Sequence, residues 1–469
     1  RKASGTSSSD EQRKDAHKVA LQQDGEDRTS STTNPFVTAY LKFCLSGVEW
    51  SGAAVLKWMQ WAGGRPDLFG HEFCQVFGRL QDHTTPHRLK VTEQRLKEAY
   101  GENWRDQVKL GELLGSGCIG QVYKGQVLKK KKRKSSDDDE NEQDEWHDVA
   151  IKVLHPSIES TIDTDLEIMR FVASSSFVQQ GGLEWLNAEG AVEEFAGLLQ
   201  MQLDLRREAK NLEEFGKNFH NDQTVVFPKL IPEYPATQHV LVETYEEGIP
   251  VTQYAKKHSD DPALLSQLCT AGIRAVCHMI FRDNFLHGDL HPGNVLVNSK
   301  KQIVLLDVGM ATQYTAEDHQ IIVDILTAFI HKKGADAGRL LMKDSNRRRQ
   351  CDGVDEEGYV KKIEALTIRA SGTDYLMEHL GTYISYICQA AADHHVLMNQ
   401  SFVSAALAIK VQEGIALALD PTVRIFRVAN PIILRTETQR RMKRFGEQVF
   451  GKTLVGDMFG GKEIVGKMA

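Results

Sequence analysis

The segment HGDLHPGN carries residue types that handle phosphate and metal ions. It places Asp289 five residues before Asn294, which is the spacing of a catalytic loop of the form H-x-D-x-x-x-x-N. In such a loop the aspartate accepts or orients the proton of an attacking hydroxyl or water, and the asparagine binds a metal ion. The sequence predicts Asp289 as the catalytic residue and Asn294 as a metal ligand. We expect His287 to pack and hydrogen-bond inside the loop.

A second acidic segment, DVG, follows after two short apolar runs. It begins at Asp307, eighteen residues beyond Asp289, and this spacing suits a tight loop followed by a hairpin. An aspartate at this place holds Mg²⁺ against the β- and γ-phosphates of ATP. We therefore expect Asp307 to be a second metal ligand, with ATP and Mg²⁺ as the cofactors.

A glycine-rich segment, GSGCIGQV, lies upstream with Gly115, Gly117, Gly120 and Val122 in the pattern G-x-G-x-x-G-x-V. Glycines let backbone amides approach phosphate oxygens without a Cβ in the way. The dinucleotide-binding version of the motif opens a helix, whereas QVYKGQV here continues as a strand. The pattern indicates a phosphate loop, and an ordinary glycine-rich hairpin turn is the alternative.

The strand VAIK supplies a lysine, Lys152, of the type that neutralises α- and β-phosphate charge. A carboxylate must orient it, and Glu208 in RREA lies on a predicted long helix, with Asp204 one turn earlier on the same face. Because this helix is rich in acids, solvated charges are the alternative. Glu243 and Tyr245, in LVETYEEG before a Gly-Pro linker, are expected to contact the nucleotide.

The spacing of apolar residues changes along the chain from helical to strand-like, and this change predicts the elements that position these residues. We expect an α+β, bilobal protein-kinase-like fold with an N-terminal helical extension and a mostly helical C-lobe. The predicted units are a disordered segment (1–34), the helical extension (35–104), an N-lobe (105–247) with a charged insertion (129–147), a C-lobe (248–435) and a C-terminal tail (436–469). The tail reads as a solvated basic helix, with a lipid-binding helix as the alternative.

Composition narrows the class of protein. The 469 residues carry a net charge of -7, which does not favour nucleic acid as a partner. The seven cysteines are scattered and form no CxxC pair, so neither a disulfide framework nor a zinc site is expected. We find no uninterrupted apolar run of the roughly 18 residues that span a bilayer. The chain starts at Arg1 rather than Met, so its compartment cannot be read from composition.

With these motifs, residues 40–430 resemble the UbiB family, also called aarF-domain-containing atypical kinases. The resemblance is closest to the mitochondrial aarF-domain-containing kinase number 2 group, through GSGCIGQVYKG, VAIKVLHP, QMQLDLRREAKNL, LVETYEEG and HGDLHPGNVLV. It implies a kinase-like fold whose helical extension carries a K-x-G-Q motif that covers the nucleotide site and blocks ordinary protein substrates. The matching residues are Lys57 and Gln60, with Met59 in place of the glycine.

Three further departures from the family pattern bear on the site. The alanine-rich loop of the family reads GSGCIGQV here, nearer an ordinary kinase loop. The family motif E-x-D reads Gln202-Leu203-Asp204, which leaves Asp204 as the one acid expected to contact the extension. The D-F-G motif reads DVG, so Asp307 is retained without the aromatic side chain that follows it in ordinary kinases.

These observations lead to a primary functional expectation and two alternatives. The first is an atypical kinase-like, Mg-ATP-binding protein, either an ATPase or a small-molecule or lipid-linked phosphotransferase, that supports mitochondrial lipid and coenzyme Q metabolism. Protein-kinase activity is not favoured. The second is a catalytically weak, nucleotide-gated scaffold for a lipid-biosynthesis complex, and the third is a helical membrane-surface protein with a degenerate core. The resemblance implies a mitochondrial, membrane-associated protein that contacts an isoprenoid lipid, with the plastid as the alternative compartment.

Overall fold

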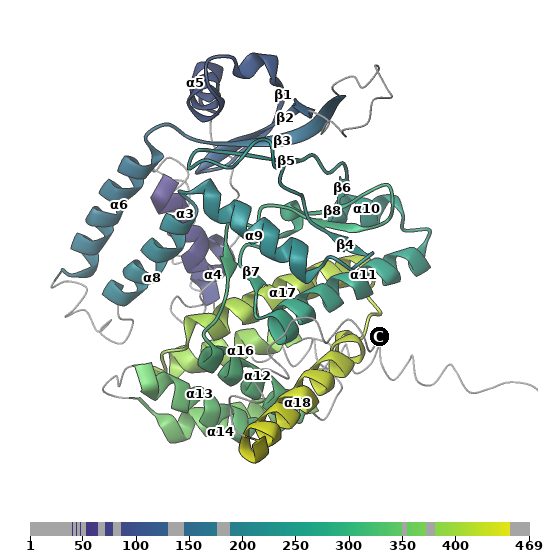
Figure 1. Cartoon of the computed structure of the whole chain (residues 1–469). Coiled ribbons are helices and arrows are strands. Elements are labelled where there is room, and N and C mark those ends of the chain that lie inside the picture. Colours follow the sequence, from purple (N-terminus) through teal and green to yellow (C-terminus); the bar gives the residue numbers. More distant parts are fainter. Residues whose placement is uncertain are drawn as a thin grey trace, which may run out of the picture.

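The computed structural model describes residues 40, 44, 47, 53–63, 71–77, 86–129, 145–175, 188–348, 354–371 and 380–450. The disordered segment expected at 1–34 and the end of the expected tail lie outside the described residues. In Figure 1 a small β-sheet with helix α5 above it forms one lobe, and a larger, mostly helical lobe lies below.

The N-lobe is built on a four-stranded antiparallel sheet. Its strands are β1 (Val108–Ser116), β2 (Gly120–Lys129), β3 (Glu145–Leu154) and β5 (Val240–Thr244), in the order β1-β2-β3-β5. One face buries a compact apolar cluster against α5 (Leu89–Tyr100), in which Trp104 and Tyr234 take part. The sheet is therefore held by its own core, separate from the large core of the C-lobe.

The two ends of the charged insertion differ from their expected boundaries. Strand β2 continues to Lys129, and β3 begins at Glu145, because these two residues pair directly across the hairpin. The intervening residues 130–144 lie outside the described part of the chain.

Helices flank the sheet and connect it to the C-lobe. They are α3 (Ala53–Gly63), α4 (His71–Phe77), α6 (Ile158–Ala173), α8 (Ala188–Met201) and α9 (Leu205–Asn218). The single long helix predicted around Glu208 is wrong, since the chain breaks between α8 and α9. Asp204 has extended backbone angles and caps α9 by accepting a hydrogen bond from the Arg206 amide, which ends one helix and starts the next.

The C-lobe combines short strands with long helices. A four-stranded sheet has the order β4-β9-β8-β6, and a two-stranded sheet pairs β7 with β10. The strands are β4 (Val225–Val226), β6 (Ile249–Pro250), β7 (Leu286–His287), β8 (Val295–Val297), β9 (Ile303–Leu305) and β10 (Ala311–Thr312). The helices are α10 (Val251–Lys257), α11 (Pro262–Cys277), α12 (Ala316–Ile330), α13 (Gly334–Arg348), α14 (Glu356–Ser371), α16 (Leu380–Asp393), α17 (Gln400–Leu419) and α18 (Ile425–Phe450).

Two helices of this lobe bear on sequence-based expectations. The run Pro262–Asp283, formed by α11 and a π-helical turn, is long and apolar enough by length and composition to cross a membrane, but 72% of its apolar 18-residue window is buried inside the protein. This burial is typical of a core helix. Helix α18 runs unbroken through position 436, where the start of the C-terminal tail was expected (Figure 1).

Phe215 on α9 lies at the junction between the helix and the C-lobe. Its ring is fully buried and stacks on Phe227 at 4.7 Å between ring centroids, with Phe285 at the same distance on another side. Aromatic contacts of this kind add to the free energy gained from burying the rings. Phe215 therefore anchors the helix that carries Glu208.

Replacing Phe215 by alanine should lower the free energy of unfolding by about 3–5 kcal/mol, because the ring leaves a cavity that its neighbours cannot fill. Urea unfolding followed by circular dichroism measures the change. Phe171→Ala is the matched control, since that ring is 77% exposed and its loss should leave the unfolding midpoint nearly unchanged. Equal effects of the two substitutions would contradict this account of the core.

Candidate nucleotide site

Strand register brings the glycine-rich segment next to Lys152. Gly115 on β1 pairs with Val122 on β2, and Val122 pairs with Lys152 on β3. Gly117 lies in the turn between β1 and β2, where its amide donates to the Gly120 carbonyl over 2.9 Å. A hairpin turn and a lysine on the third strand are thus joined in one sheet.

The Lys152 ammonium group contacts two carboxylates from different parts of the chain. Its Nζ lies 2.8 Å from Oε2 and 3.0 Å from Oε1 of Glu208, and 2.9 Å from Oδ1 of Asp307. The Glu208 side chain is only 5% exposed, that of Lys152 19%, and that of Asp307 45%. The three groups therefore link the N-lobe sheet, α9 and the C-lobe.

The pKa values of Lys152, Asp307 and Glu208 are set by burial and by the charges of the other two groups. Burial alone would lower the pKa of Lys152, but the negative charges of Asp307 and Glu208 raise it above its ordinary value. Burial would raise the pKa of Asp307, yet Lys152, with a smaller contribution from Lys57, holds it well below its usual range. Burial raises the pKa of Glu208, because Lys152 offsets the desolvation only in part. Lys152 thus pairs with both carboxylates and is their shared counter-ion.

The backbone around Asp307 is held in an uncommon conformation. Asp307 has φ 47°, in the left-handed region that residues other than glycine rarely occupy. The next residue, Val308, is fully buried, and its carbonyl accepts a 2.8 Å hydrogen bond from Asn211 Nδ2 on α9. Helix α9 therefore contacts Lys152 through Glu208 and the DVG segment through Asn211. The sequence analysis missed Asn211, whose only signal is its position one turn after Glu208.

The expected catalytic loop is organised around a buried histidine. The His287 Nε2 lies 2.9 Å from the Leu306 carbonyl, and its Nδ1 accepts from the Asp289 amide at 3.3 Å. Burial lowers the pKa of His287, so the ring is neutral. It connects two backbone segments by hydrogen bonds. This confirms that His287 packs and hydrogen-bonds inside the loop.

Asn294 and Asp307 are brought together by a short hairpin. Strands β8 and β9 pair Val295 with Leu305, and the Leu306 amide donates to the Asn294 carbonyl over 2.9 Å. Asn294 Nδ2 donates to the Asp289 carbonyl over 3.1 Å, which orients the amide oxygen as the remaining ligand atom. The hairpin length explains the spacing between the two acidic segments.

The donor set fits a magnesium ion shared with phosphates. Asp307 and Asn294 offer a carboxylate and an amide oxygen, the hard ligands that Mg²⁺ prefers, and this ion commonly takes few protein ligands with the rest from phosphate and water. Among the described residues there is no cluster of three or more histidine, cysteine, aspartate or glutamate side chains that could hold a metal by themselves. An ion here would depend on the nucleotide.

The sequence analysis also missed a histidine that fastens the glycine-rich loop. His155, three residues after Lys152, donates through its backbone amide to the Ile119 carbonyl and through Nε2 to the Gly117 carbonyl, both at 2.8 Å. Gly120 must be a glycine because a Cβ there would lie 2.7 Å from the Val153 carbonyl. The loop is therefore held close against the end of β3. A polar residue directly after an apolar strand was the available signal.

His155 is itself fixed by the segment that precedes α5. Its Nδ1 lies 2.7 Å from Nδ1 of His87, whose Nε2 lies 2.8 Å from the Thr92 hydroxyl. The Gln121 side chain accepts from the His87 amide at 2.9 Å and also bonds the Tyr123 hydroxyl. Burial lowers the pKa of His87 to about 4, with His155 and Arg95 adding to the shift. A neutral, continuous network thus connects the extension to the loop.

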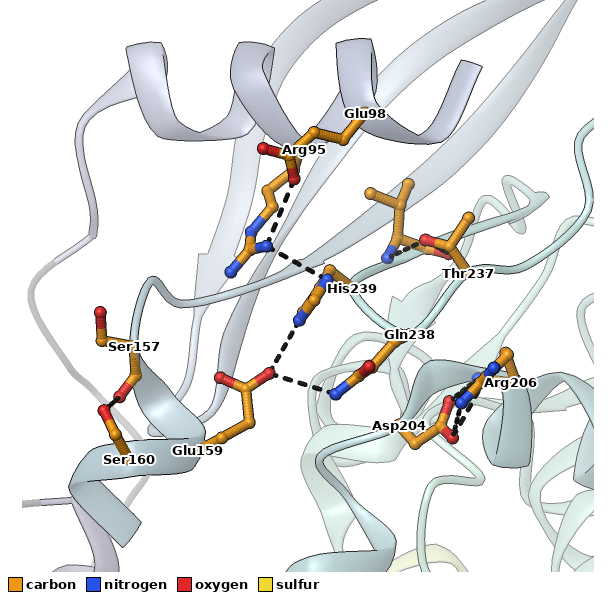
Figure 2. A network of polar contacts seen from close by, with 11 residues as sticks. Arg95, Glu98, Ser157, Glu159, Ser160, Asp204, Arg206, Thr237, Gln238 and His239 are labelled. Atoms are coloured by element: carbon orange, nitrogen blue, oxygen red, sulfur yellow. Dashed lines mark hydrogen bonds and ion pairs between the residues drawn. The ribbon is translucent and has the colours of Figure 1, made fainter. Parts of the chain in front are cut away.

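The helical extension reaches the site through α3. Lys57 and Gln60 are half-buried on this helix, and the charge of Lys57 is felt at Asp307. The other residue expected to contact the extension, Asp204, makes a bidentate ion pair with Arg206 at 2.7 and 2.8 Å (Figure 2). Asp204 precedes α9 rather than lying on the helical face of Glu208, so the expected shared face is wrong.

Figure 2 also shows a contact between α5 of the extension and α6 of the N-lobe. Arg95 on α5 donates to Nδ1 of His239 over 3.1 Å, and Nε2 of His239 donates to Glu159 on α6 over 2.8 Å. The histidine therefore bridges α5 and α6 directly before β5. This bridge fixes α5 over the sheet independently of the His87 network.

Glu243 and Tyr245 lie where β5 leaves the N-lobe. Burial raises the pKa of Glu243 to about 8, and the negative charge of Glu208 adds to the rise. The Tyr245 ring accepts the Lys124 ammonium at 4.5 Å from its centroid, and its amide lies 3.4 Å from the Asp148 carbonyl. Glu243 thus lies within the electrostatic reach of the Lys152 cluster, while the Tyr245 side chain packs against Lys124 of β2.

The sheet, the α9 ion pair and the two acidic loops define a kinase-like fold. A comparison of structures agrees: the solved complex of Rv3197 with erythromycin from Mycobacterium tuberculosis matches 90% of this chain and 98% of its own, with a TM-score of 0.51 and 18% sequence identity.

The ABC1 atypical kinase-like domain model matches residues 79–340, more than half of the chain, and the chain belongs to this family. A mitochondrial ABC1 family protein of Saccharomyces cerevisiae is 29% identical over 84% of this chain and 68% of its own length. The UbiB protein of Vibrio cholerae is 29% identical over 60% of this chain and 50% of its own. These relatives confirm the resemblance to the UbiB and aarF proteins.

The raised pKa of Glu243 predicts a pH-dependent stability. Its carboxyl stays protonated in the folded protein up to about pH 8, against an ordinary value of 4.5, so the folded state binds more protons between these values. Stability should therefore fall as pH rises through this window, by at most about 1.4 kcal/mol per pH unit from this group. Glu243→Gln should remove that part of the slope, as measured by urea unfolding at pH 5 and pH 8.

The control for this prediction is Glu247→Gln, which neutralises an exposed carboxyl on the same segment. It should leave the slope of the wild type intact. If Glu243→Gln and wild type lost equal stability between the two pH values, the assigned burial effect would be wrong.

Loss of the His155 ring should loosen the glycine-rich loop. His155→Phe removes the donor to the Gly117 carbonyl, and losing about 1 kcal/mol of hydrogen bonding should speed amide exchange in residues 117–120 about fivefold. His155→Gln keeps an N–H donor and should restore most of the protection. Hydrogen–deuterium exchange with mass spectrometry measures both, and identical exchange in wild type and His155→Phe would refute the fastening role.

Proposed function

We propose that this protein binds Mg-ATP between its two lobes and acts as an atypical ATPase or phosphotransferase on a small or lipid-linked acceptor. In this proposal Lys152 neutralises phosphate charge, while Asn294 and Asp307 hold the magnesium ion. Asp289 accepts or orients the proton of the attacking hydroxyl or water. Gly115, Gly117, Gly120 and Val122 form the phosphate loop, and Glu243 and Tyr245 border the nucleotide.

The single observation that carries this proposal is the position of the Lys152 ammonium between Glu208 and Asp307. A lysine held by one buried carboxylate and paired with a second, more exposed carboxylate supports a role in phosphate binding. A triphosphate carries several negative charges, so it can replace Asp307 as the counter-ion of Lys152. Asp307 would then be available to the metal ion without leaving the lysine uncompensated.

The extension supports an acceptor other than an ordinary protein. Lys57 on α3 lies close enough to Asp307 to lower its pKa, and α3 belongs to the same apolar core as α6 and α8. In this proposal helices α3 and α5 of the extension belong to a cover over the site, with Lys57, Gln60 and Asp204 at its contact. Such a cover would exclude an extended peptide and admit water or a small headgroup.

We place the activity in mitochondrial lipid and coenzyme Q metabolism. The relative in yeast, at 29% identity, is a mitochondrial protein and supports the compartment, while the link to lipid and coenzyme Q metabolism comes from the resemblance to the UbiB family, of which the Vibrio cholerae protein at 29% identity is a member. An isoprenoid lipid, a membrane surface and a lipid-biosynthesis complex are the partners that fit the proposal. We also propose that the chain is organised into three units, which are the extension, the N-lobe and the C-lobe.

A second candidate is a scaffold in which nucleotide closes the lobes without efficient turnover. The ion pair between Lys152 on the N-lobe and Asp307 on the C-lobe favours it, because nucleotide binding must rearrange a contact that joins the lobes. Asp289→Asn separates the two candidates. Loss of phosphate release together with loss of cellular rescue supports catalysis, and rescue despite lost phosphate release supports the scaffold.

Magnesium and ATP together should stabilise the wild-type protein. Binding to the folded state alone adds about 2.7 kcal/mol at a ligand concentration one hundred times the dissociation constant. A thermal-shift titration with ATP and ADP, each with and without Mg²⁺, measures the effect. Asp307→Asn should lose the magnesium-dependent part of the shift, because an amide replaces the carboxylate that would hold the ion.

Asp336→Asn is the control, since this aspartate is exposed on α13 and pairs with Arg339 at the surface. It should respond to Mg-ATP as the wild type does. If the wild-type melting temperature stayed constant under all nucleotide conditions, both candidate functions would be rejected.

A further inference from the structure

The C-lobe contains an apolar cavity that is separate from the Lys152 cluster. It lies between α11, α12, α17 and α18, and has a volume of about 60 Å³. Since one water needs roughly 10–15 Å³ by this kind of measure, the space holds about four to six groups of that size, which suits a short hydrocarbon chain. Its walls are almost entirely aliphatic and aromatic, including Ile273, Phe329 and Ile409.

Two buried polar side chains, Gln412 and Glu413, interrupt these apolar walls. Gln412 on α17 is 7% exposed, and its Nε2 donates to no acceptor among the residues that the structure describes. The amide is pressed against α11, where a Cβ on Gly272 would lie 2.6 Å from Nε2. Leaving a buried donor without an acceptor costs about 1–3 kcal/mol, so this position is suited to a ligand that supplies an oxygen.

Gln412 lies at the junction of two spaces. It lines the larger cavity and also a smaller one of about 10 Å³, which Leu290 and Val295 border. These two residues adjoin Asp289 and Asn294 in the sequence. The amide is therefore placed in the middle of the lobe, between the helical cavity and the base of the proposed catalytic loop.

We propose that this cavity binds a small, uncharged, apolar molecule, or the apolar end of a longer one, that presents a carbonyl oxygen to Gln412 Nε2. Apolar walls favour a hydrocarbon body, at about 25 cal/mol for each Å² removed from water. The single donor selects an oxygen acceptor within that body.

The first turns of α18 form one wall of the site. Ile425, Ala429 and Ile433 recur every four residues, which places them on one face of the helix and toward the cavity. The next residue, Leu434, is 43% exposed and points away. This helix therefore offers a position that can fill the cavity and a neighbouring position that cannot.

Two isosteric probes test the donor directly. 2-Butanone and 2-methyl-1-butene differ mainly in having a carbonyl oxygen or a methylene group at one position. The preference for the ketone, defined as the ratio of ketone affinity to alkene affinity, should be about two- to tenfold higher in the full-length wild type than in Gln412→Leu, because the two proteins share the cost of desolvating the ketone and differ by one buried hydrogen bond. Saturation-transfer NMR and thermal shift measure the two affinities. Gln412→Leu should retain alkene binding and lose the preference for the ketone.

A second pair of variants keeps the proposal testable if Gln412→Leu does not fold. Ala429→Phe fills the cavity from α18 and should abolish binding of both probes, whereas Leu434→Phe should bind them as the wild type does. The proposal is overturned if the wild type binds neither probe, if Gln412→Leu keeps the ketone preference, or if Ala429→Phe binds as well as Leu434→Phe. Because the site is separate from Lys152, Mg-ATP binding measured on the same samples reports on the proposed function independently.

Discussion

The ammonium group of Lys152 must be compensated inside a largely buried junction, and this constraint organises much of the molecule. Glu208 is buried and Asp307 is half-exposed, and they come from α9 and from the segment after β9. Removing either partner would leave a desolvated charge with an incomplete counter-ion, which is costly. The lobes therefore cannot shift independently of α9, and the position of α9 in turn depends on Phe215 and Asn211.

A second set of polar contacts connects the extension to the same junction. His87 and His155 connect the start of α5 to the Gly117 carbonyl, and Lys57 on α3 adds its charge near Asp307. In an ordinary glycine-rich loop the backbone is free to move over the phosphates. Here the loop is hydrogen-bonded from behind, so the extension and the proposed phosphate loop behave as one unit.

The sequence predicted more of the fold than of the individual contacts. The bilobal α+β class, the three-strand arrangement of Gly115, Val122 and Lys152, and the hairpin between the two acidic loops follow from motif and spacing. The single helix expected around Glu208 was wrong, because Asp204 caps a new helix instead of continuing the old one. Periodicity shows no break there, since apolar residues on both sides keep helical spacing, although residues 202–204 form a non-helical turn between the two helices.

What the sequence determined by itself is the chemistry available: a lysine, an asparagine and aspartates at kinase-like spacing, because short loops and hairpins bring near neighbours together with little choice. Tertiary structure decided which carboxylate pairs with Lys152, since Glu208 and Asp307 lie 99 residues apart and meet only when α9 packs on the C-lobe. Only the tertiary structure places His155 next to Gly117 and Gln412 between two cavities. Contacts of this kind depend on packing between distant segments, and no local pattern encodes them.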